Sequence, residues 1–347
     1  MKTFIHIGYP KNFSSSLQAQ FFSRHPEVLH LGSGTGKHNY SCISPEVESL
    51  IEVYLKTAGT YTWVRDREEL RNDLHRIINE RWNSRHKSVT ISSEHLSFKY
   101  SNDSIDLESK FERLKYLFKE NVYFIIIIRN QWDLLKSLWR EYVRTGFHKS
   151  FFDFIETIYQ LQDRNLYHDL NYHRTYRVIR THFPRASVKF MTFETYRDKN
   201  GLVFNKNTPK ILSDLSDFLE VSKLDFSFEN TNAALSNNVL HEMLYSNAIT
   251  RHNIGNSLIE SAEKHRLETW LNNVLKLDKT ENEIFEDVKA KRKLIENLSK
   301  TERPKNMYGC NPRTFEKIQD YYTQTNKTLN DELNLCLPTC YYDFTCT

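Results

Sequence analysis

Hydrophobic positions along this chain alternate between two spacings, one typical of strands and the other typical of helices. Residues Phe4–Gly8 form a short β-rich run, whereas Leu17, Phe21 and Phe22 recur at the spacing of a buried helix face. The alternation continues, with further strands predicted at 28–31, 89–92, 123–128 and 188–194 and further helices at 46–55, 67–81, 107–118, 132–142 and 211–219. Strands that alternate with helices predict an α/β fold, in which a parallel central β-sheet is flanked by helices.

Two later segments extend this architecture. Tyr123–Ile128 is unbroken in its apolar character, which is typical of a central parallel strand buried on both faces. From about residue 230 to residue 347 the pattern is helical, with helices predicted at 258–275, 281–298 and 315–333 and with Asn311-Pro312 as the start of the last one. No internal repeat and no Pro/Gly/Ser-rich linker divides the chain, so we expect a single domain over residues 1–347.

Composition narrows the class of protein. The 347 residues are 39% hydrophobic and 27% charged, as in ordinary soluble globular proteins. A formal net charge of +4 is too small to make nucleic acid or an anionic membrane the main partner. The longest apolar run, Val122–Ile128, is far short of a bilayer span, and the first predicted strand begins almost at Met1, which leaves no room for a signal peptide. We therefore expect a cytoplasmic protein.

The cysteines predict neither a disulfide framework nor a metal site. They are few and odd in number for this length, so reduced thiols are expected: Cys42, Cys310, Cys336, Cys340 and Cys346. The last three crowd the C-terminus, but no histidine lies nearby and their spacing matches no zinc pattern. We expect no bound metal.

The stretch between the first strand and the first helix has the features of a phosphate-binding loop. It runs from Tyr9 through Pro10 to three serines, and it leads directly into the helix, so free backbone N–H groups and the helix dipole point at one place. Lys11 adds a full positive charge, and the hydroxyls of Ser14, Ser15 and Ser16 can cap the helix or bond phosphate oxygens. The alternative interpretation is that Ser14 is only an N-cap and Lys11 only a solvated loop lysine.

A second glycine-rich stretch, Gly32–His38, is similar to a Walker loop at first sight. It is one residue short between its glycines, and His38 stands where the magnesium-binding Ser or Thr of that loop is expected. We interpret it as a loop at the mouth of the site.

Another anion contact is predicted at the end of the 123–128 strand. Arg129-Asn130 follows the strand at once, and Ser137 lies about two turns along the next helix. An arginine at a strand tip and a serine on the following helix can hold one phosphate from two sides, the guanidinium through paired hydrogen bonds.

These two stretches together resemble the nucleotide-binding motifs of sulfotransferases that use 3′-phosphoadenosine 5′-phosphosulfate (PAPS). Ile7–Lys11 followed by Ser14–Gln18 resembles the 5′-phosphosulfate loop, and Ile126–Asn130 with Ser137 is similar to the 3′-phosphate motif. Two positions depart from the family pattern: Phe13 stands in place of the usual glycine, where its Cβ and ring would restrict backbone approach to the phosphate, and Gln131 stands in place of the usual proline.

The resemblance implies a fold, a co-substrate and a set of contacts. The fold would be the P-loop-like sulfotransferase fold, with PAPS as co-substrate and no metal. The residues that match the family's nucleotide contacts are Lys11, Asn12, Phe13, Ser14, Ser15, Ser16, Arg129 and Ser137. A loop in the later part of the family often folds over the nucleotide, which makes Arg303 and Lys305 in the basic stretch 303–310 further candidates, against the alternative of a solvated basic loop.

Candidates for the general base follow the strand predicted at 89–92. Glu94 and His95 are both able to take a proton from an acceptor. The run Ile91–Glu94 looks like the bacterial and carbohydrate branch of the family, whose base is usually a glutamate, whereas many small-molecule sulfotransferases use a histidine in this region. We favour Glu94 over His95, and the structural alternative is that Glu94 caps the following helix.

Three functional hypotheses follow. The first is sulfuryl transfer from PAPS to a hydroxyl or amine of a small-molecule or carbohydrate acceptor, since two separated phosphate contacts match the PAPS nucleotide better than ATP. The second is a magnesium-dependent nucleotide kinase of related architecture, which would need a way to hold the metal. The third is a catalytically silent relative that binds PAPS or its product 3′-phosphoadenosine 5′-phosphate (PAP), motivated by Phe13. The sequence favours no acceptor among glycans, phenols, alkaloids and lipid hydroxyls, and it indicates no oligomeric state.

Overall fold

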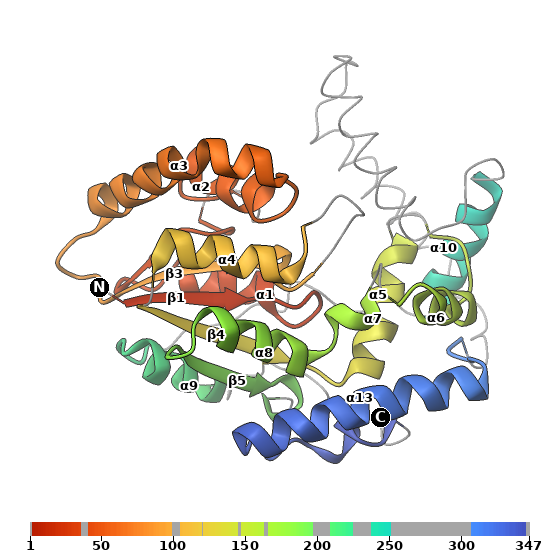
Figure 1. Cartoon of the computed structure of the whole chain (residues 1–347). Coiled ribbons are helices and arrows are strands. Elements are labelled where there is room, and N and C mark those ends of the chain that lie inside the picture. Colours follow the sequence, from red (N-terminus) through yellow and green to blue (C-terminus); the bar gives the residue numbers. More distant parts are fainter. Residues whose placement is uncertain are drawn as a thin grey trace.

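The computed structural model describes residues 2–35, 41–98, 105–119, 121–144, 147–162, 166–196, 209–224, 237–250 and 307–344. Its core is a sheet of five parallel strands in the order β2-β3-β1-β4-β5 (Figure 1). The strands are β1 (Lys2–Ile7), β2 (Val28–His30), β3 (Ser88–Ser93), β4 (Val122–Ile128) and β5 (Ser187–Thr192). The predicted parallel α/β fold is confirmed. The run at 122–128 is an interior strand as expected, although β1 occupies the middle of the sheet.

Helices connect and cover the strands. After β1 come α1 (Ser14–Ser16) and η1 (Leu17–Phe22), and after β2 come α2 (Pro45–Ser49), η2 (Leu50–Tyr54) and α3 (Thr60–Arg81). The next are η3 (Glu94–Leu96), α4 (Leu107–Phe118), α5 (Gln131–Arg144), α6 (Phe151–Gln160), α7 (Leu166–Asp169) and α8 (Tyr172–His182). The later elements are η5 (Phe193–Tyr196), α9 (Pro209–Leu219), α10 (Asn237–Thr250), α13 (Pro312–Leu333) and η6 (Thr339–Tyr341).

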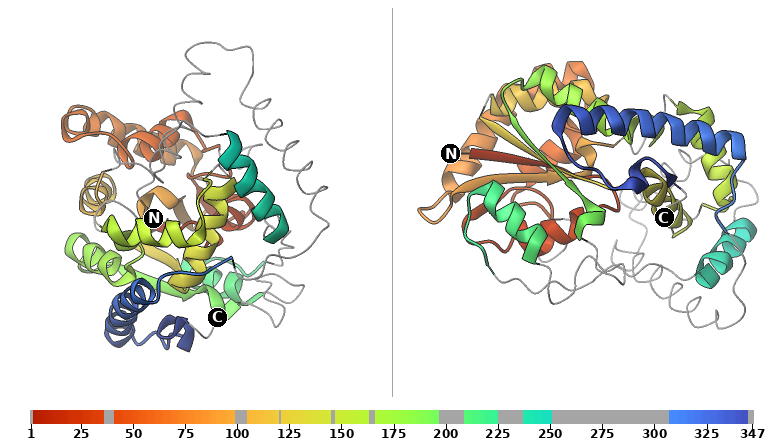
Figure 2. Two further views of the ribbon diagram at one scale, coloured as in Figure 1. Left: turned by 90° about the vertical axis from the view of Figure 1, so that its right-hand side faces the viewer. Right: turned by 90° about the horizontal axis from the view of Figure 1, so that it is seen from below.

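Side chains that alternate along each strand build one core on each face of the sheet. Phe4 and Ile125 belong to the core beneath η1 and α9, whereas Ile5 and Ile126 belong to the larger core formed with α3, α4, α5, α8 and α13. The two views of Figure 2 show the sheet between these layers. Because both faces are covered, β4 has no polar face, and this explains its unbroken apolar sequence.

Most predicted element boundaries agree with the structure, and the largest difference is the start of α3. The helix begins at Thr60, seven residues before the predicted Arg67. Its first two turns expose Tyr61 at 81% and Val64 at 51%, so apolar residues on the outer surface obscured the pattern of the buried face. The predicted start of the last helix is confirmed, because the Asn311 side chain accepts a hydrogen bond from the N–H of Arg313. The helices predicted at 258–275 and 281–298 lie outside the described residues.

Two histidines are buried beneath the sheet as neutral groups. Nδ1 of His6 lies 2.7 Å from the hydroxyl oxygen of Ser92. In His30, Nδ1 lies 2.9 Å from the Thr90 hydroxyl oxygen and Nε2 lies 3.0 Å from the carbonyl oxygen of Ser33. Burial lowers the pKa of His6 to about 3 and the pKa of His30 to about 4 from the ordinary value of 6.5.

Neutral burial of these histidines predicts a loss of stability in mild acid. In the unfolded chain both rings take up protons below pH 6.5, whereas in the folded protein they stay neutral down to about pH 4 and pH 3, so stability is lost as pH falls from 6.5 through this range. Each histidine adds up to about 1.4 kcal/mol per pH unit to the slope of unfolding free energy. We expect His6→Gln to lower that slope by about this amount in urea titrations between pH 6 and pH 4.5. The control is His182→Gln at the end of α8, and an unchanged slope in the His6 variant would contradict the prediction.

Candidate functional site

Gly8 marks the point where the first loop and the end of β3 come together. Its N–H donates to the carbonyl of Ser93 at 3.1 Å. A Cβ placed on Gly8 would lie 2.7 Å from Ser14 Oγ and 3.2 Å from Glu94 Cγ, so only glycine permits this approach. Two of the predicted site residues, Ser14 and Glu94, therefore both lie against Gly8.

The loop itself turns through two residues in the left-handed region. Lys11 has φ of 62° and Phe13 has φ of 79°, a conformation that glycine adopts most easily. Between them Asn12 is fully buried, and its amide donates to the carbonyl of Ile127 at 3.0 Å, which fixes the loop to β4. The Phe13 ring packs against the core beneath the sheet.

The three serines differ in what they contact. The Ser14 hydroxyl is buried and donates to the carbonyl of Tyr9 at 3.2 Å, while the N-cap of α1 is Phe13, without a side-chain cap. The interpretation of Ser14 as an N-cap is therefore wrong, because its hydroxyl closes the loop instead. Ser15 is exposed and Ser16 is half-buried at the start of the helix.

Arg129, the predicted anion contact at the end of β4, lies beside this loop. Its guanidinium donates from one terminal nitrogen to the carbonyl of Lys11 at 3.3 Å and stacks over the Phe193 ring, 5.0 Å from the centroid. The Tyr172 hydroxyl donates to the carbonyl of Arg129 at 2.6 Å. Backbone and side chain of Arg129 are thus both held at the edge where β4 ends.

The residues after Arg129 are tied to the C-terminal part of the chain. The N–H of Asn130 donates to Glu194 Oε1 at 2.8 Å, and the other carboxylate oxygen of Glu194 accepts from the Tyr341 hydroxyl at 2.8 Å. Gln131 and Asn326 exchange two amide hydrogen bonds, of 2.8 Å and 2.9 Å. The departure from proline at position 131 therefore supplies a contact to α13.

The helix that follows Arg129 carries a carboxylate that sequence reasoning missed. Ser137 is half-buried on α5, and Glu141 stands one helical turn further on. Glu141 Oε2 lies 3.3 Å from Lys11 Nζ and 3.2 Å from the Arg144 guanidinium. Burial would raise the pKa of Glu141, but the charges of Lys11 and Arg144 outweigh it and lower the pKa below the usual 4.5. A lone Glu in an amphipathic helix gives no sequence signal for such a pair.

The two candidate bases, adjacent in sequence, have different neighbours. Both lie on η3, whose N-cap is Ser93, with its hydroxyl accepting from the N–H of His95 at 3.1 Å. Glu94 adjoins Gly8, whereas His95 Nε2 lies 3.1 Å from Glu52 Oε1 on η2. Burial lowers the pKa of His95, and the Glu52 carboxylate opposes this effect.

The remaining predicted site residues, Arg303 and Lys305, lie outside the described residues. The described chain resumes at Met307, and Tyr308 packs on α5. The Tyr308 hydroxyl accepts from Arg140 Nε at 2.7 Å, and its ring lies 5.7 Å from that of Trp139.

The glycines of the stretch that is similar to a Walker loop have a packing role in the part of the chain that the structure describes. A Cβ on Gly32 would lie 2.8 Å from the carbonyl oxygen of Ser92, and Gly34, with φ of +95°, lies against the backbone of Gln18. His38 lies outside the described residues.

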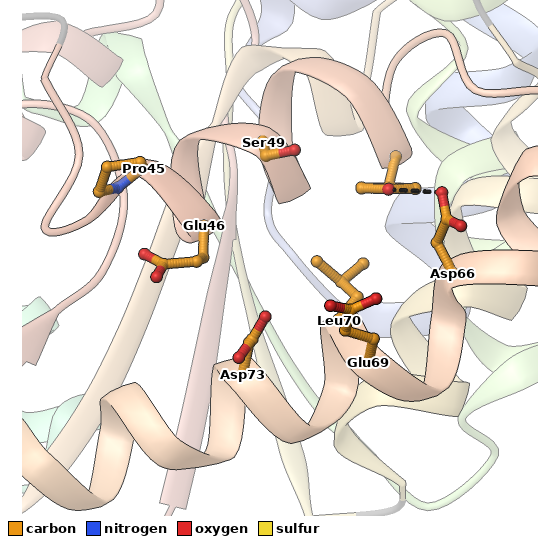
Figure 3. Close-up of a pocket in the computed structure, with 8 residues that line it drawn as sticks. Pro45, Glu46, Ser49, Asp66, Glu69, Leu70 and Asp73 are labelled. Atoms are coloured by element: carbon orange, nitrogen blue, oxygen red, sulfur yellow. Dashed lines mark hydrogen bonds between the residues drawn. The ribbon is translucent and has the colours of Figure 1, made fainter.

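A cavity of about 470 Å³ lies away from these residues, between α2, η2 and α3 (Figure 3). It is lined by Pro45, Glu46, Ser49, Tyr54, Asp66, Glu69, Leu70 and Asp73. Asp66 accepts from the Tyr54 hydroxyl at 2.8 Å, and Arg76 pairs with Asp73 at 3.1 Å and with Glu46 at 3.4 Å. None of the predicted site residues lines this acidic cavity.

Metal-binding clusters and membrane-spanning helices are both absent from the part of the chain that the structure describes. Among those residues, no group of three or more His, Cys, Asp or Glu side chains is placed to hold a metal ion. Nor is any helix among them both long enough and apolar enough to cross a bilayer.

Among known proteins, the chain is similar to solved structures but not to any family model or curated sequence. No protein-family model matches the chain, and no curated protein sequence matches it. Among solved structures, the chain is similar to a sulfotransferase from Alicyclobacillus acidocaldarius, with 16% sequence identity and a TM-score of 0.43, over 74% of this chain and 98% of that one.

Proposed function

We propose that the protein is a PAPS-dependent sulfotransferase, which moves a sulfuryl group to a hydroxyl or amine of a small-molecule or carbohydrate acceptor. The observation that carries the proposal is the contact between the two candidate phosphate sites, in which the Arg129 guanidinium bonds the carbonyl of Lys11 at 3.3 Å. One ligand with phosphate at two separated places can engage both sites, and PAPS has that form.

The proposed step is an in-line displacement at sulfur. The acceptor oxygen or nitrogen forms the new bond to sulfur while the bond from sulfur to the bridging phosphate oxygen breaks, and that electron pair leaves with PAP. Lys11 neutralises the charge that grows on the leaving phosphate. Glu94 takes the proton that the acceptor loses.

The neighbours of the two candidate bases support Glu94. The Glu94 side chain adjoins Gly8 at the start of the proposed phosphate-binding loop, whereas the His95 ring contacts Glu52 on η2. Backbone strain at Phe13, with φ of 79°, motivates a second candidate, in which the chain binds the nucleotide without transferring sulfuryl. Screening acceptors with labelled PAPS distinguishes the two, since a silent relative would bind PAP and turn over none of them.

The two-site proposal predicts that PAP binds more tightly than adenosine 5′-phosphate. Arg129 and Ser137 have a phosphate partner only in PAP, and each charge-assisted contact contributes about 1.5 to 3 kcal/mol. Arg129→Ala should erase most of the preference while leaving the affinity for adenosine 5′-phosphate close to that of the parent. Calorimetry that finds equal affinities for the two nucleotides in the parent protein would refute the 3′-phosphate assignment.

Lys11 should matter more for transfer than for binding. Its charge is needed most when the leaving phosphate gains charge, so Lys11→Ala is expected to retain part of the PAP affinity but to lose most of the turnover of labelled PAPS. Lys11→Arg should recover little, because a planar guanidinium does not replace a compact ammonium in a tight loop. Near-parental turnover of Lys11→Ala would make Lys11 a loop residue without a catalytic role.

Glu94→Gln tests the general base. The substitution keeps the shape and a hydrogen-bonding group but removes the basic oxygen, so turnover should fall by about 10² to 10⁴ with PAP affinity preserved. His95→Ala is the comparison, and its effect should be milder. If Glu94→Gln instead lowers the midpoint of thermal unfolding and hardly changes the rate per folded molecule, the role of Glu94 is structural.

A further inference from the structure

Glu141 is a carboxylate shared by two cations at the candidate donor site. Its Oε2 lies 3.3 Å from Lys11 Nζ and 3.2 Å from the Arg144 guanidinium. Lys11 comes from the loop after β1, whereas Arg144 follows Glu141 by three residues on α5. The carboxylate therefore connects the loop to the helix that carries Ser137.

The Glu141 carboxylate lies where it would compete with an anionic ligand for Lys11. Glu141 stands four residues after Ser137, so both project from the same face of α5. Arg129 reaches the carbonyl of Lys11. A fixed negative charge among these groups repels a phosphate or phosphosulfate and occupies the ammonium that would bind it.

The Lys11–Glu141 pair is built so that it can open. The Lys11 side chain is 28% exposed and the Glu141 side chain 39% exposed, and ion pairs with this much solvent contact contribute little to stability. The Arg144 side chain is more buried, at 19% exposed. When Lys11 leaves, Glu141 thus keeps a cationic partner on its own helix.

We infer that Glu141 is a resident competitor for Lys11, which holds the ammonium in the ligand-free protein and yields it when the donor's 5′-phosphosulfate enters the loop. The inference deepens the proposed function and rests on it only for the identity of the anion. It assigns Glu141 a positioning role, in which the carboxylate keeps weakly held anions from the Lys11 ammonium.

Removal of the competing charge should tighten anion binding through Lys11. In calorimetric titrations with PAP and, separately, with inorganic pyrophosphate, Glu141→Gln should bind each about 2- to 5-fold more tightly than the parent, the range expected for a partly solvated ion pair. The gain should disappear when Lys11→Met is added. Glu141→Asp keeps the charge but withdraws it by one methylene, so it should give part of the gain.

Asp133→Asn is the matched control, because it removes one negative charge from the first turn of the same helix, where Asp133 pairs with Lys136 at 3.4 Å. It should leave both affinities within error of the parent. The thermal unfolding midpoint without ligand should be nearly unchanged in Glu141→Gln, which a structural role for the pair would not allow.

The outcomes separate a failure of the Glu141 inference from a failure of the proposed function. Affinity that does not rise in either Glu141 variant, or a gain of equal size in the Lys11→Met background, overturns the competitor role. If pyrophosphate binding follows the expected pattern but PAP binds no more tightly than pyrophosphate, Glu141 keeps its role and the nucleotide assignment fails. If PAP binds as proposed and neither Glu141 variant differs from the parent, only the Glu141 inference is lost.

Discussion

Parallel pairing of β1 with β3 on one side and with β4 on the other is the constraint on which the candidate site depends. Ile7, the last residue of β1, is opposite Ser93 in β3 and Ile126 in β4. Because parallel strands run in one direction, the loops that follow all three leave from the same edge. That edge is where Lys11, Glu94 and Arg129 follow their strands. If one of these strands ran in the opposite direction, the residue that follows it would lie at the far end of the sheet, away from the other two.

Backbone contacts then fix the loops to one another more closely than the sheet alone would. Gly8 bonds the carbonyl of Ser93, the Asn12 amide bonds the carbonyl of Ile127, and Arg129 bonds the carbonyl of Lys11. In each bond the acceptor is a main-chain oxygen, whose position varies little when a side chain rotates. A charged group held this way loses less conformational entropy when a ligand arrives.

Sequence reasoning predicted what local periodicity and chain order determine. The strand predicted at 123–128 follows from burial of both its faces, and the helix at 107–118 follows from burial of one face. The approach of Glu94 to the Lys11 loop follows once the strands are parallel. Glu141 and the exchange of amides between Gln131 and Asn326 could not be predicted, because they join residues 130 and 195 positions apart. A carboxylate or an amide has the same local signature whether it faces water or a partner. The start of α3 was missed for a different reason, since Tyr61 and Val64 place apolar surface on the solvent side.

Phe13 and Gln131, the two positions that differ from the motifs the sequence resembles, have opposite physical consequences. The left-handed backbone of Phe13 costs conformational energy that glycine would avoid. Packing of the Phe13 ring against the core beneath η1 and α9 offsets part of that cost. Gln131 costs the chain nothing of this kind. It replaces a rigid helix start with an amide that binds Asn326, and the amide of Asn326 also donates to the carbonyl of Tyr341 at 2.9 Å. Since Tyr341 in turn bonds the carboxylate that holds Asn130, the position of Arg129 at the end of β4 depends on packing of the last described residues of the chain.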